Sequence, residues 1–329
     1  MWTNKRLIIC FAFDFILANI RLEIVGGIVY SDLIFDYIRK VEGSKDFKNS
    51  SNGNSLGVSV DSYEIKSDEE SLKYGKPIGK YKLMSIPDCL TLDKKDIEYC
   101  IDKFSDILKS IIGHISSRDK ILVVGLGNRH ISSDSLGAKV VGKINITIEN
   151  NVLPKVMAIS PSVMGLTGIE TVDIIEGVVM KTKASHVIVI DSLCASSASR
   201  LGKSIQVTNT GICPGGGVGN KRKCIDKKIA PNVFSIGVPL LIYASTFVSE
   251  TLHENGIDEE NIISIMQSVI KGEKNSQFID LLKSIKKVLN DDVDNMIVSL
   301  KDIKECVEIL STIIASAINK AIGVDDVHE

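Results

Sequence analysis

Short apolar runs alternate with helical stretches through the middle of the chain. Apolar runs of strand length occur at 121–125, 155–159, 186–191, 204–208 and 233–237, while helical patterns begin near residue 134 and cover 170–183. Continuous apolar strands that alternate with helices are typical of a parallel sheet covered on both faces. We therefore predict an α/β fold, doubly wound, with a mainly parallel sheet, helices on both faces and further helices at the C-terminal end.

Changes in composition divide the chain into four regions. Residues 42–79 are rich in Ser, Asn, Gly, Lys and Asp, a composition that cannot bury enough apolar surface to offset chain entropy. Helical spacing of apolar residues resumes after residue 259 and predicts helices that close the core or form an oligomer surface. The predicted regions are an N-terminal segment at 1–41 that is a candidate propeptide, a polar linker at 42–94, an α/β catalytic core at 95–256 and a C-terminal helical region at 257–329.

The apolar stretch 7–20 follows Lys5 and Arg6, a combination that also occurs in signal peptides. Asp14 interrupts this stretch, and a membrane span needs about 20 uninterrupted apolar residues. We therefore favour a buried or partner-covered segment, with export as the alternative.

Bulk composition narrows the classes of function. Hydrophobic residues make up 44% of the 329 residues and aromatic residues only 5%, so aliphatic side chains must fill the core. A formal net charge of -2 argues against a general nucleic-acid binder, which usually carries a strong basic excess. The seven cysteines show no zinc-site spacing, and reduced thiols of a cytosolic protein are the simplest interpretation.

Two aspartates lie at the predicted carboxyl ends of strands, where the ligand-binding and catalytic residues of an open parallel sheet are usually found. Asp191 closes the apolar run 186–191, where an acid without a partner is costly, and Asp134 follows the turn 125–128 at the start of a helix. Two neighbouring carboxyl groups can share a proton, so that one activates water while the other protonates the substrate amide. Such a pair suffices for peptide hydrolysis without a metal. The alternative is that both aspartates only cap helices.

Other motifs give weaker indications. The turn 125–127 suggests dinucleotide binding, but His130 stands where the third glycine is required. The glycine-rich stretch 213–223 lacks the ending of a phosphate loop and suits a loop that receives an extended peptide or makes a subunit contact. The alternative is a surface turn with a solvated basic tail. His130 is a candidate metal ligand, although a solvated loop histidine explains it as well. Cys194 shows no histidine partner and is interpreted as a buried thiol.

Five stretches in order resemble the signatures of the germination protease family. They are 123–128 with 133–137, 160–171, 189–195, 210–223 and 235–239, and together they cover about residues 120–250. Five long matches in order are far more specific than any single glycine motif. The resemblance implies an aspartate-dependent endopeptidase related in fold to hydrogenase maturation proteases. It assigns the catalytic roles to Asp134 and Asp191, and we expect neither a metal nor another cofactor.

The resemblance also implies substrates and partners. The expected substrates are small acid-soluble spore proteins, cleaved in the cytoplasm of the spore core during germination by a homotetramer that contacts neither nucleic acid nor membrane directly. The family enzyme is a zymogen that processes its own N-terminus. Glu23-Ile24 is the candidate cut, because 22–25 is similar to the sequence at which the family cuts. Substrate-binding or site loops are expected at Gly127, Asn128, Gly165, Thr167, Gly168, Gly217 and Asn220.

Departures from the family pattern leave both carboxylates in place. Ser133 and Ala138 stand where the family usually has proline, and the first forty residues do not resemble the usual family start. Two other functions stay open at this point. One is a metal-assisted maturation-type protease with Asp134, Asp191 and His130 around an ion, and the other is a catalytically silent peptide-binding protein of the same fold.

Overall fold

The computed structural model describes residues 32–36, 38, 56–147, 154–213, 223–254 and 296–324, which fall into two compact units. The described parts of the smaller unit are residues 196–198, 242–254 and 296–298. They include helix α8 (Ala244–Glu254), whose Glu250 Oε2 accepts a hydrogen bond of 2.8 Å from the Ala198 N–H. The other described residues belong to the larger unit, which holds the candidate site.

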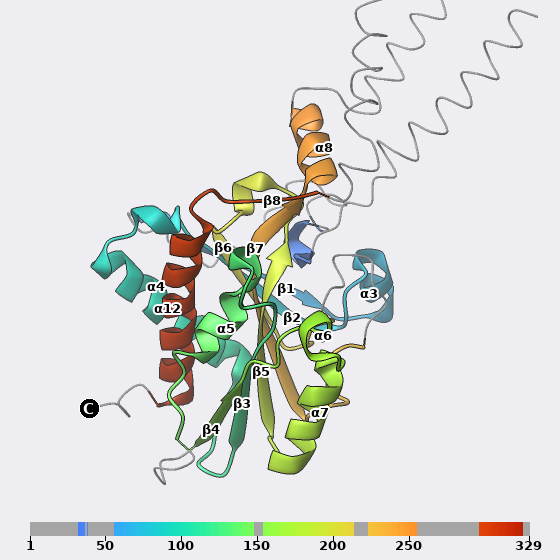
Figure 1. The fold of residues 1–329 in the computed structure, drawn as a ribbon, viewed down its shortest axis with the longest axis vertical. Helices are drawn as coiled ribbons and strands as arrows, with labels where there is room; N and C mark the ends of the chain where they lie inside the picture. Colours follow the sequence, from blue (N-terminus) through green and yellow to red (C-terminus); the bar gives the residue numbers. More distant parts are fainter. Residues whose placement is uncertain are drawn as a thin grey trace, which may run out of the picture. The chain divides into compact units, whose positions relative to one another are not determined.

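One eight-stranded sheet organises the fold, in the order β1-β2-β6-β7-β5-β3-β4 with β8 paired to β7. Strands β7, β5, β3 and β4 pair in parallel, whereas β1, β2 and β6 pair antiparallel with their neighbours (Figure 1). The strands are β1 (Ser59–Ile65), β2 (Gly79–Ser85), β3 (Lys120–Gly125), β4 (Lys155–Ile159), β5 (His186–Cys194), β6 (Ser204–Thr208), β7 (Asn232–Tyr243) and β8 (Ile297–Ser299).

All five predicted strands are present as β3 to β7, and β5 and β7 continue beyond their predicted ends. The sheet is mixed rather than mainly parallel, so that part of the fold prediction is wrong. The reason lies in the connection 195–203 between β5 and β6. Such a short connection lets the chain reverse its direction, whereas a crossover between parallel strands needs a dozen or more residues.

Part of the expected polar linker forms regular structure. Residues 56–94 contain β1, α3 (Asp68–Tyr74), β2 and the 3-10 helix η2 (Cys89–Thr91). Val60 and Ile65 of β1 and Tyr81 and Leu83 of β2 are buried. Polar residues stand between these buried apolar side chains along both strands, so the average composition of the hairpin is polar. Composition alone therefore hides two strands.

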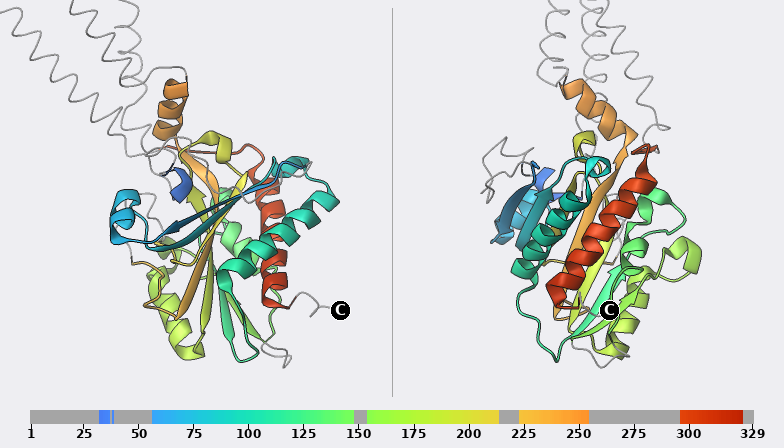
Figure 2. Two further views of the ribbon diagram at one scale, coloured as in Figure 1. Left: turned by 180° about the vertical axis from the view of Figure 1, so that it is seen from behind. Right: turned by 90° about the vertical axis from the view of Figure 1, so that its left-hand side faces the viewer.

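Helices cover both faces of the sheet, as predicted. Helices α4, α5 and α12 pack on one face around a large aliphatic core, and α7 packs on the other around a smaller one (Figures 1 and 2). Helix α12 is one of the helices expected at the C-terminal end, and it buries Val307, Leu310 and Ile314. The helix predicted after residue 259 lies outside the described residues. Helix bounds are α4 (Lys94–Ile112), α5 (Leu136–Val141), α6 (Met164–Thr167), α7 (Thr171–Thr182) and α12 (Ile303–Ile322), with 3-10 helices η3 (Ser132–Asp134) and η4 (Ala198–Arg200).

Cysteines depart from the sequence-based expectation at one place. Cys213 and Cys224 form a disulfide, so the prediction that every cysteine is a reduced thiol is wrong for this pair. The two residues stand on either side of the glycine-rich stretch, and the fold brings them together although eleven positions separate them in the chain. None of the helices in the described ranges combines the length and the apolarity that a membrane crossing requires.

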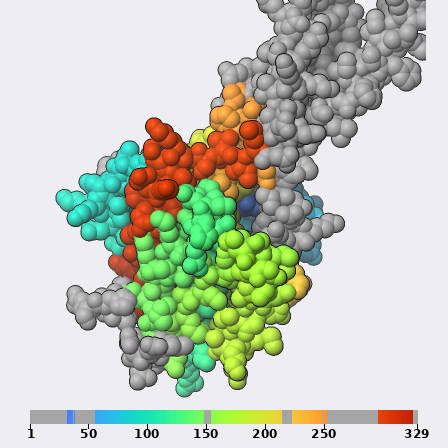
Figure 3. Space-filling model, viewed as in Figure 1, coloured from blue at the N-terminus to red at the C-terminus, as the bar shows by residue number. Residues whose placement is uncertain are grey.

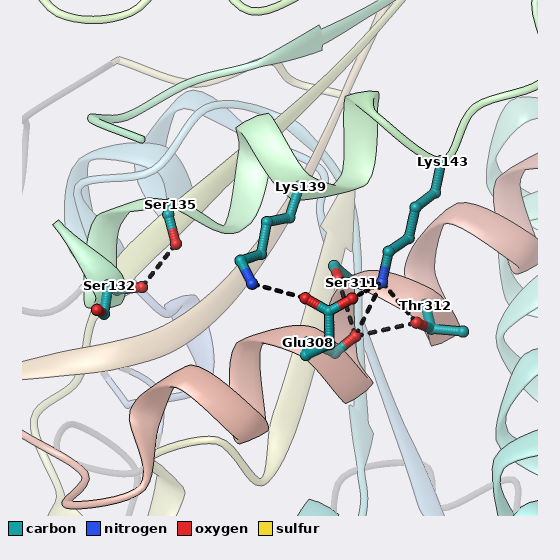
Figure 4. Close-up of polar contacts among 7 residues, drawn as sticks. All are labelled: Ser132, Ser135, Lys139, Lys143, Glu308, Ser311 and Thr312. Carbon is teal, nitrogen blue, oxygen red and sulfur yellow. Dashed lines mark hydrogen bonds and ion pairs between the residues drawn. The ribbon is translucent and has the colours of Figure 1, made fainter. Parts of the chain in front are cut away.

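An ionic cluster joins α5 to the C-terminal helix α12. Glu308 of α12 accepts hydrogen bonds of 2.6 Å from Lys139 and 2.6 Å from Lys143, and Lys143 also donates to Thr312 (Figure 4). Ser135 closes the turn before α5 by a bond to the Ser132 carbonyl. The two lysines lower the pKa of Glu308 to about 2. Helix α5 follows directly after the candidate catalytic Asp134, so this cluster fixes the element next to the site.

Replacing Glu308 by Gln is expected to lower the free energy of unfolding by about 1 kcal/mol at pH 7. The effect is small because 53% of the side chain is exposed and water screens both ion pairs. Since the folded pKa lies below the unfolded one, the stabilisation is complete above the ordinary pKa of 4.5 and is lost as pH falls through about 2.

Urea unfolding of wild type and variant at pH 7 and near pH 2 measures both effects. An equal difference at the two pH values would contradict the assignment. Asp102→Asn is the matched control, because it removes the exposed Asp102–Lys320 pair between α4 and α12. A single exposed pair of this kind is worth under about 0.5 kcal/mol.

Candidate active site

Asp191 lies in β5, inside the sheet rather than at a helix start. It is opposite Gly237 of β7 in the parallel ladder, it is only 9% exposed, and its Oδ1 accepts a hydrogen bond of 2.9 Å from the Ser192 N–H. Burial, then the negative charges of Asp134 and Asp32, raise the pKa of Asp191 well above its ordinary value of 3.8. The surroundings of this side chain therefore favour its neutral, protonated form over the charged one.

The turn after β3 delivers Asp134 to the same edge of the sheet. The Leu126 N–H donates to the Ile190 carbonyl at 2.8 Å, which continues the β3–β5 ladder up to the residue before Asp191. The Asn128 N–H then donates to Asp134 Oδ2 at 2.7 Å and closes the turn. Asp134 makes no cap to α5, whose N-cap position is Ser135. The helix-capping alternative therefore does not describe this carboxylate.

Gly127 is required at the centre of this turn. Its φ is +92°, and a Cβ at this position would lie 2.1 Å from the Asp134 carbonyl oxygen and 2.6 Å from Asp134 Oδ1. No side chain fits there, so the backbone of the turn can lie directly against the carboxylate. Burial raises the pKa of Asp134, and the Asn128 N–H partly offsets that rise.

A third aspartate, which the sequence analysis missed, lies next to the pair. The Asp32 N–H donates to the Cys194 carbonyl at 3.0 Å, and Asp32 Oδ2 accepts from the Cys194 N–H at 2.9 Å, so Asp32 binds the end of β5. Lys76 donates to the Asp32 carbonyl oxygen at 3.1 Å. The next residues, Leu33 and Ile34, are fully buried.

The anchoring of this segment continues beyond Asp32. The Ile34 N–H donates to Gln206 of β6 at 3.1 Å, and Asp36 pairs with Arg200 at 2.9 Å. The sequence signal is the run Asp-Leu-Ile-Phe-Asp, in which an apolar core element is bracketed by acids. This signal is overlooked when all of residues 1–41 are interpreted as a segment that can be removed from the core.

Asp32→Asn is expected to move the alkaline limb of the pH profile of peptide cleavage to lower pH. The Asp32 charge is one cause of the raised pKa of Asp191, so its removal lets Asp191 ionise at lower pH. Cleavage should fall over the same pH range, because the role expected of a catalytic Asp191 needs its proton. The measurement is kcat/KM against pH for wild type, Asp32→Asn and the surface control Asp102→Asn, whose exposed side chain pairs with Lys320. An unmoved limb in Asp32→Asn, or an equal shift in the control, would contradict the role of Asp32.

The other predicted site residues are dispersed. Gly165 and Thr167 belong to α6 and Gly168 ends that helix with a φ of +71°, all of them exposed and bonded only within their own turn. The α5 region and α6 lie side by side on one face of the molecule (Figure 3). Gly217, Asn220, Glu23 and Ile24 lie outside the described residues. The structure thus brings Gly127 and Asn128 to the aspartates and leaves α6 as a neighbouring surface.

The residues weighed for other chemistries have local roles. His130 is exposed, and its N–H donates to the Asn128 side chain at 2.9 Å. Cys194 is buried, and its backbone holds Asp32. Within the described ranges, no group of three or more His, Cys, Asp or Glu side chains is arranged to hold a metal ion.

Comparison with known proteins agrees with the motifs. The germination protease family model matches residues 39–255. The germination protease of Clostridium acetobutylicum is 35% identical over 289 residues, which cover 80% of this chain and 85% of the relative. The Clostridium perfringens protein of the same name is 33% identical over 284 residues, with 80% and 84% covered, and the Bacillus licheniformis one is 38% identical over 210 residues, with 60% and 56% covered. The family that the five motifs predicted is thereby confirmed, and this chain belongs to the germination proteases, which are peptidases.

Proposed function

We propose that this chain is an endopeptidase that cleaves small acid-soluble spore proteins during germination, with Asp134 and Asp191 as its catalytic pair. The observation that carries the proposal is the electrostatic contact between the two aspartates. Asp191 is buried at the carboxyl-end edge of the parallel strands, and the charge of Asp134 helps to raise its pKa. Pairs of carboxyl groups whose environments differ in this way are typical of acid–base catalysis.

The two environments suggest which group does what. Burial and two neighbouring negative charges favour the neutral form of Asp191 more strongly than that of Asp134. Asp191 therefore donates a proton to the amide oxygen or the leaving nitrogen. Asp134 is less buried and its pKa is raised less than that of Asp191, so it accepts a proton from the attacking water. Water then attacks the peptide carbonyl between the two groups. The proton that Asp134 gains returns to Asp191 through product and solvent, which completes the cycle.

The remaining expectations belong to the same proposal. The substrate peptide passes the turn at Gly127 and Asn128 and the loops that contain Gly165, Thr167, Gly168, Gly217 and Asn220. The enzyme works without a cofactor, in the cytoplasm of the spore core, and assembles as a homotetramer. Exposed apolar side chains of α6, Met164 and Leu166, support a peptide-binding role for that surface, because a solvent-exposed apolar cluster next to a site often binds a ligand.

The test is cleavage of a purified small acid-soluble spore protein by the purified full-length chain, with and without a metal chelator. Cleavage at a few defined bonds that persists in chelator supports a metal-free aspartate endopeptidase. Mass spectrometry of the products locates the bonds, and an unrelated unfolded protein such as reduced casein serves as the substrate control. Equal cleavage of both proteins would contradict the substrate assignment, and loss of cleavage in chelator would favour the metal-assisted alternative.

Self-processing is part of the proposal and has its own measurement. Residues 32–36 bind at the end of β5, so the N-terminal region of the chain reaches the catalytic edge. Sequencing the N-terminus of fully active protein gives Ile24 if the Glu23-Ile24 bond is cut. A start at Leu33 would instead assign the cut to the Asp32–Leu33 bond, which lies beside Cys194 at the end of β5. An intact Met1 in fully active protein would contradict processing.

A further inference from the structure

The Cys213–Cys224 disulfide differs from the other described cysteines in its access to solvent. Cys213 is exposed and Cys224 is half-buried. The remaining described cysteines are buried thiols, namely Cys89, Cys100, Cys194 and Cys306. Even the thiol pair Cys89 and Cys306, with 2.8 Å between the sulfurs, is closed to solvent. Among the described residues, a small thiol in solution can therefore reach only one disulfide and none of the thiols.

The disulfide joins the two segments that flank the glycine-rich stretch, residues 211–213 and 223–225. These two segments are called the neck below. One residue further in, Ile212 and Ile225 form an isolated antiparallel bridge, with hydrogen bonds of 3.0 and 2.8 Å between their backbones. Gly211 has a φ of +82°, and a Cβ there would lie 2.0 Å from the Ile225 carbonyl oxygen, so the two arms of the neck are in direct backbone contact. The disulfide thus lies next to the Ile212–Ile225 backbone pairing, which is not part of the main sheet.

The neck is connected to the catalytic strand by short contacts. Ser235 of β7 donates to the Gly211 carbonyl at 2.9 Å, and two residues later Gly237 stands opposite Asp191. The other arm packs Ile225 into the core beneath α7, and Lys223 pairs with Asp173 in the first turn of α7 at 2.7 Å. Any loosening of the neck therefore acts on β7 and on α7, the two elements that flank the catalytic edge.

We propose that Cys213 and Cys224 form a reversible thiol–disulfide exchange site that takes low-molecular-weight thiols and their disulfides. A cytosolic compartment is rich in such thiols and keeps accessible cysteines reduced unless conditions become oxidising. A disulfide in a cytosolic chain is therefore expected to be labile when it is exposed. The thiol–disulfide balance of the surroundings therefore determines whether the two segments of the neck are covalently joined.

The exchange balances with the thiol as the reductant. A thiolate attacks the exposed Cys213 Sγ, forms a mixed disulfide there and expels the Cys224 thiolate. A second thiolate then removes the small-molecule sulfur from Cys213 as a low-molecular-weight disulfide. The protein gains two thiols, and the two small thiols lose two electrons. In the reverse direction the low-molecular-weight disulfide is the oxidant, and two small thiols leave.

The consequence for catalysis rests on the proposed function. With the disulfide closed, the backbone beside β7 is already ordered when the peptide binds. With the disulfide open, binding must order it, which weakens binding without altering the two carboxyl groups. Reduction is therefore expected to raise KM for a spore protein about 3- to 10-fold and to leave kcat within about twofold. The amides of Ile212 and Ile225 are expected to exchange hydrogen at least about tenfold faster.

The experiment equilibrates full-length protein in buffers of reduced and oxidised glutathione, in a Cys10→Ser background so that every remaining cysteine lies within the described residues. Native alkylation and mass spectrometry count the accessible thiols, hydrogen exchange measures the neck, and cleavage of the spore protein gives KM and kcat. The expected count is two labels in reduced protein and none in oxidised protein. The double variant Cys213→Ser/Cys224→Ser is the matched control and should show the reduced-state KM in both buffers.

Three results would overturn the proposal: a disulfide that glutathione does not open, labels on the buried cysteines instead, or a KM and neck exchange that are the same in both states. Redox-dependent kinetics that persist in the double variant would also overturn it. If neither redox form cleaves the spore protein, the proposed function fails, while the thiol count and the neck exchange still decide whether the exchange site exists.

Discussion

Asp191→Asn is expected to reduce kcat/KM for a spore protein by about 10³-fold or more, which is the scale of losing a general acid in a shared-proton pair. An amide of the same size fills the same place in β5 but cannot donate the proton. Geometry is preserved, because Asp191 accepts its hydrogen bond from the Ser192 N–H and an amide oxygen accepts it equally well. The loss therefore falls on kcat rather than on KM.

Stability is expected to change in the opposite direction. The folded pKa of Asp191 is raised above the unfolded value, so the folded state binds the proton more tightly and the carboxyl group stabilises the fold only at low pH. That contribution is lost as pH rises from the unfolded pKa through the folded one. At neutral pH the asparagine variant should be at least as stable as wild type, and its unfolding free energy should depend less on pH.

Urea unfolding and steady-state cleavage of the same preparations test both statements. Asp61→Asn is the matched control, because Asp61 is also a buried aspartate in this sheet, at 6% exposure in β1. It should retain activity. A variant at Asp191 that keeps more than about a tenth of wild-type kcat/KM would remove Asp191 from the mechanism. A variant that is inactive and also strongly destabilised would show that the carboxyl group serves the fold.

Sequence reasoning succeeds where one physical rule dominates. The strands β3, β4 and β5 are apolar along most of their length because helices cover them on both sides, so their runs are visible without any structure. The β3–β5 pairing ends at Gly125 and Ile190, so Asp191 and the turn that leads to Asp134 follow at the same edge. That is why Asp134 and Asp191 can be predicted together, although 57 positions separate them in the sequence (191 minus 134).

Sequence reasoning fails where the partner of a segment is distant. The strands β1 and β2 mix buried apolar residues with exposed polar ones, and an average over their composition conceals the buried residues. The role of Asp32 depends on its hydrogen bonds with Cys194 and Lys76, and that of Cys213 on its disulfide with Cys224. These partners are distant in the sequence, so no local sequence pattern predicts the contacts. The mixed sheet has the same cause, since strand direction follows from the length of a connection rather than from the strands that it joins.

The segments whose partners are distant in the sequence lie around the two carboxylates. The two carboxylates belong to the parallel half of the sheet, whereas the segments that surround them, residues 32–36 and the neck at Cys213, are bound through β5, β6 and β7. The parallel α/β core thus carries the two candidate catalytic carboxylates, and one of the segments bound around them, at Asp32, raises the pKa of Asp191.

Gly127→Ala is expected to cost about 2–4 kcal/mol of unfolding free energy and to reduce kcat/KM by about 10²-fold or more. Two effects combine: the residue has a φ of +92°, and the new Cβ would lie 2.1 Å from the Asp134 carbonyl oxygen. Relief of that overlap must move either the backbone of the turn or Asp134 itself. A shift of about 1 Å in a catalytic group has a rate effect of this size.

Gly113→Ala separates the two effects, because Gly113 has a similar φ of +81° at the end of α4 and a Cβ added there would meet no heavy atom within 4 Å. It should cost only the conformational penalty, about 1–3 kcal/mol, and leave cleavage unchanged. Urea unfolding and cleavage of both variants against wild type are the measurements. If Gly127→Ala behaves like Gly113→Ala, the turn tolerates a side chain and Asp134 does not depend on the close approach. If it loses activity far beyond its loss of stability, the glycine is present because the catalytic carboxylate occupies the space of its side chain.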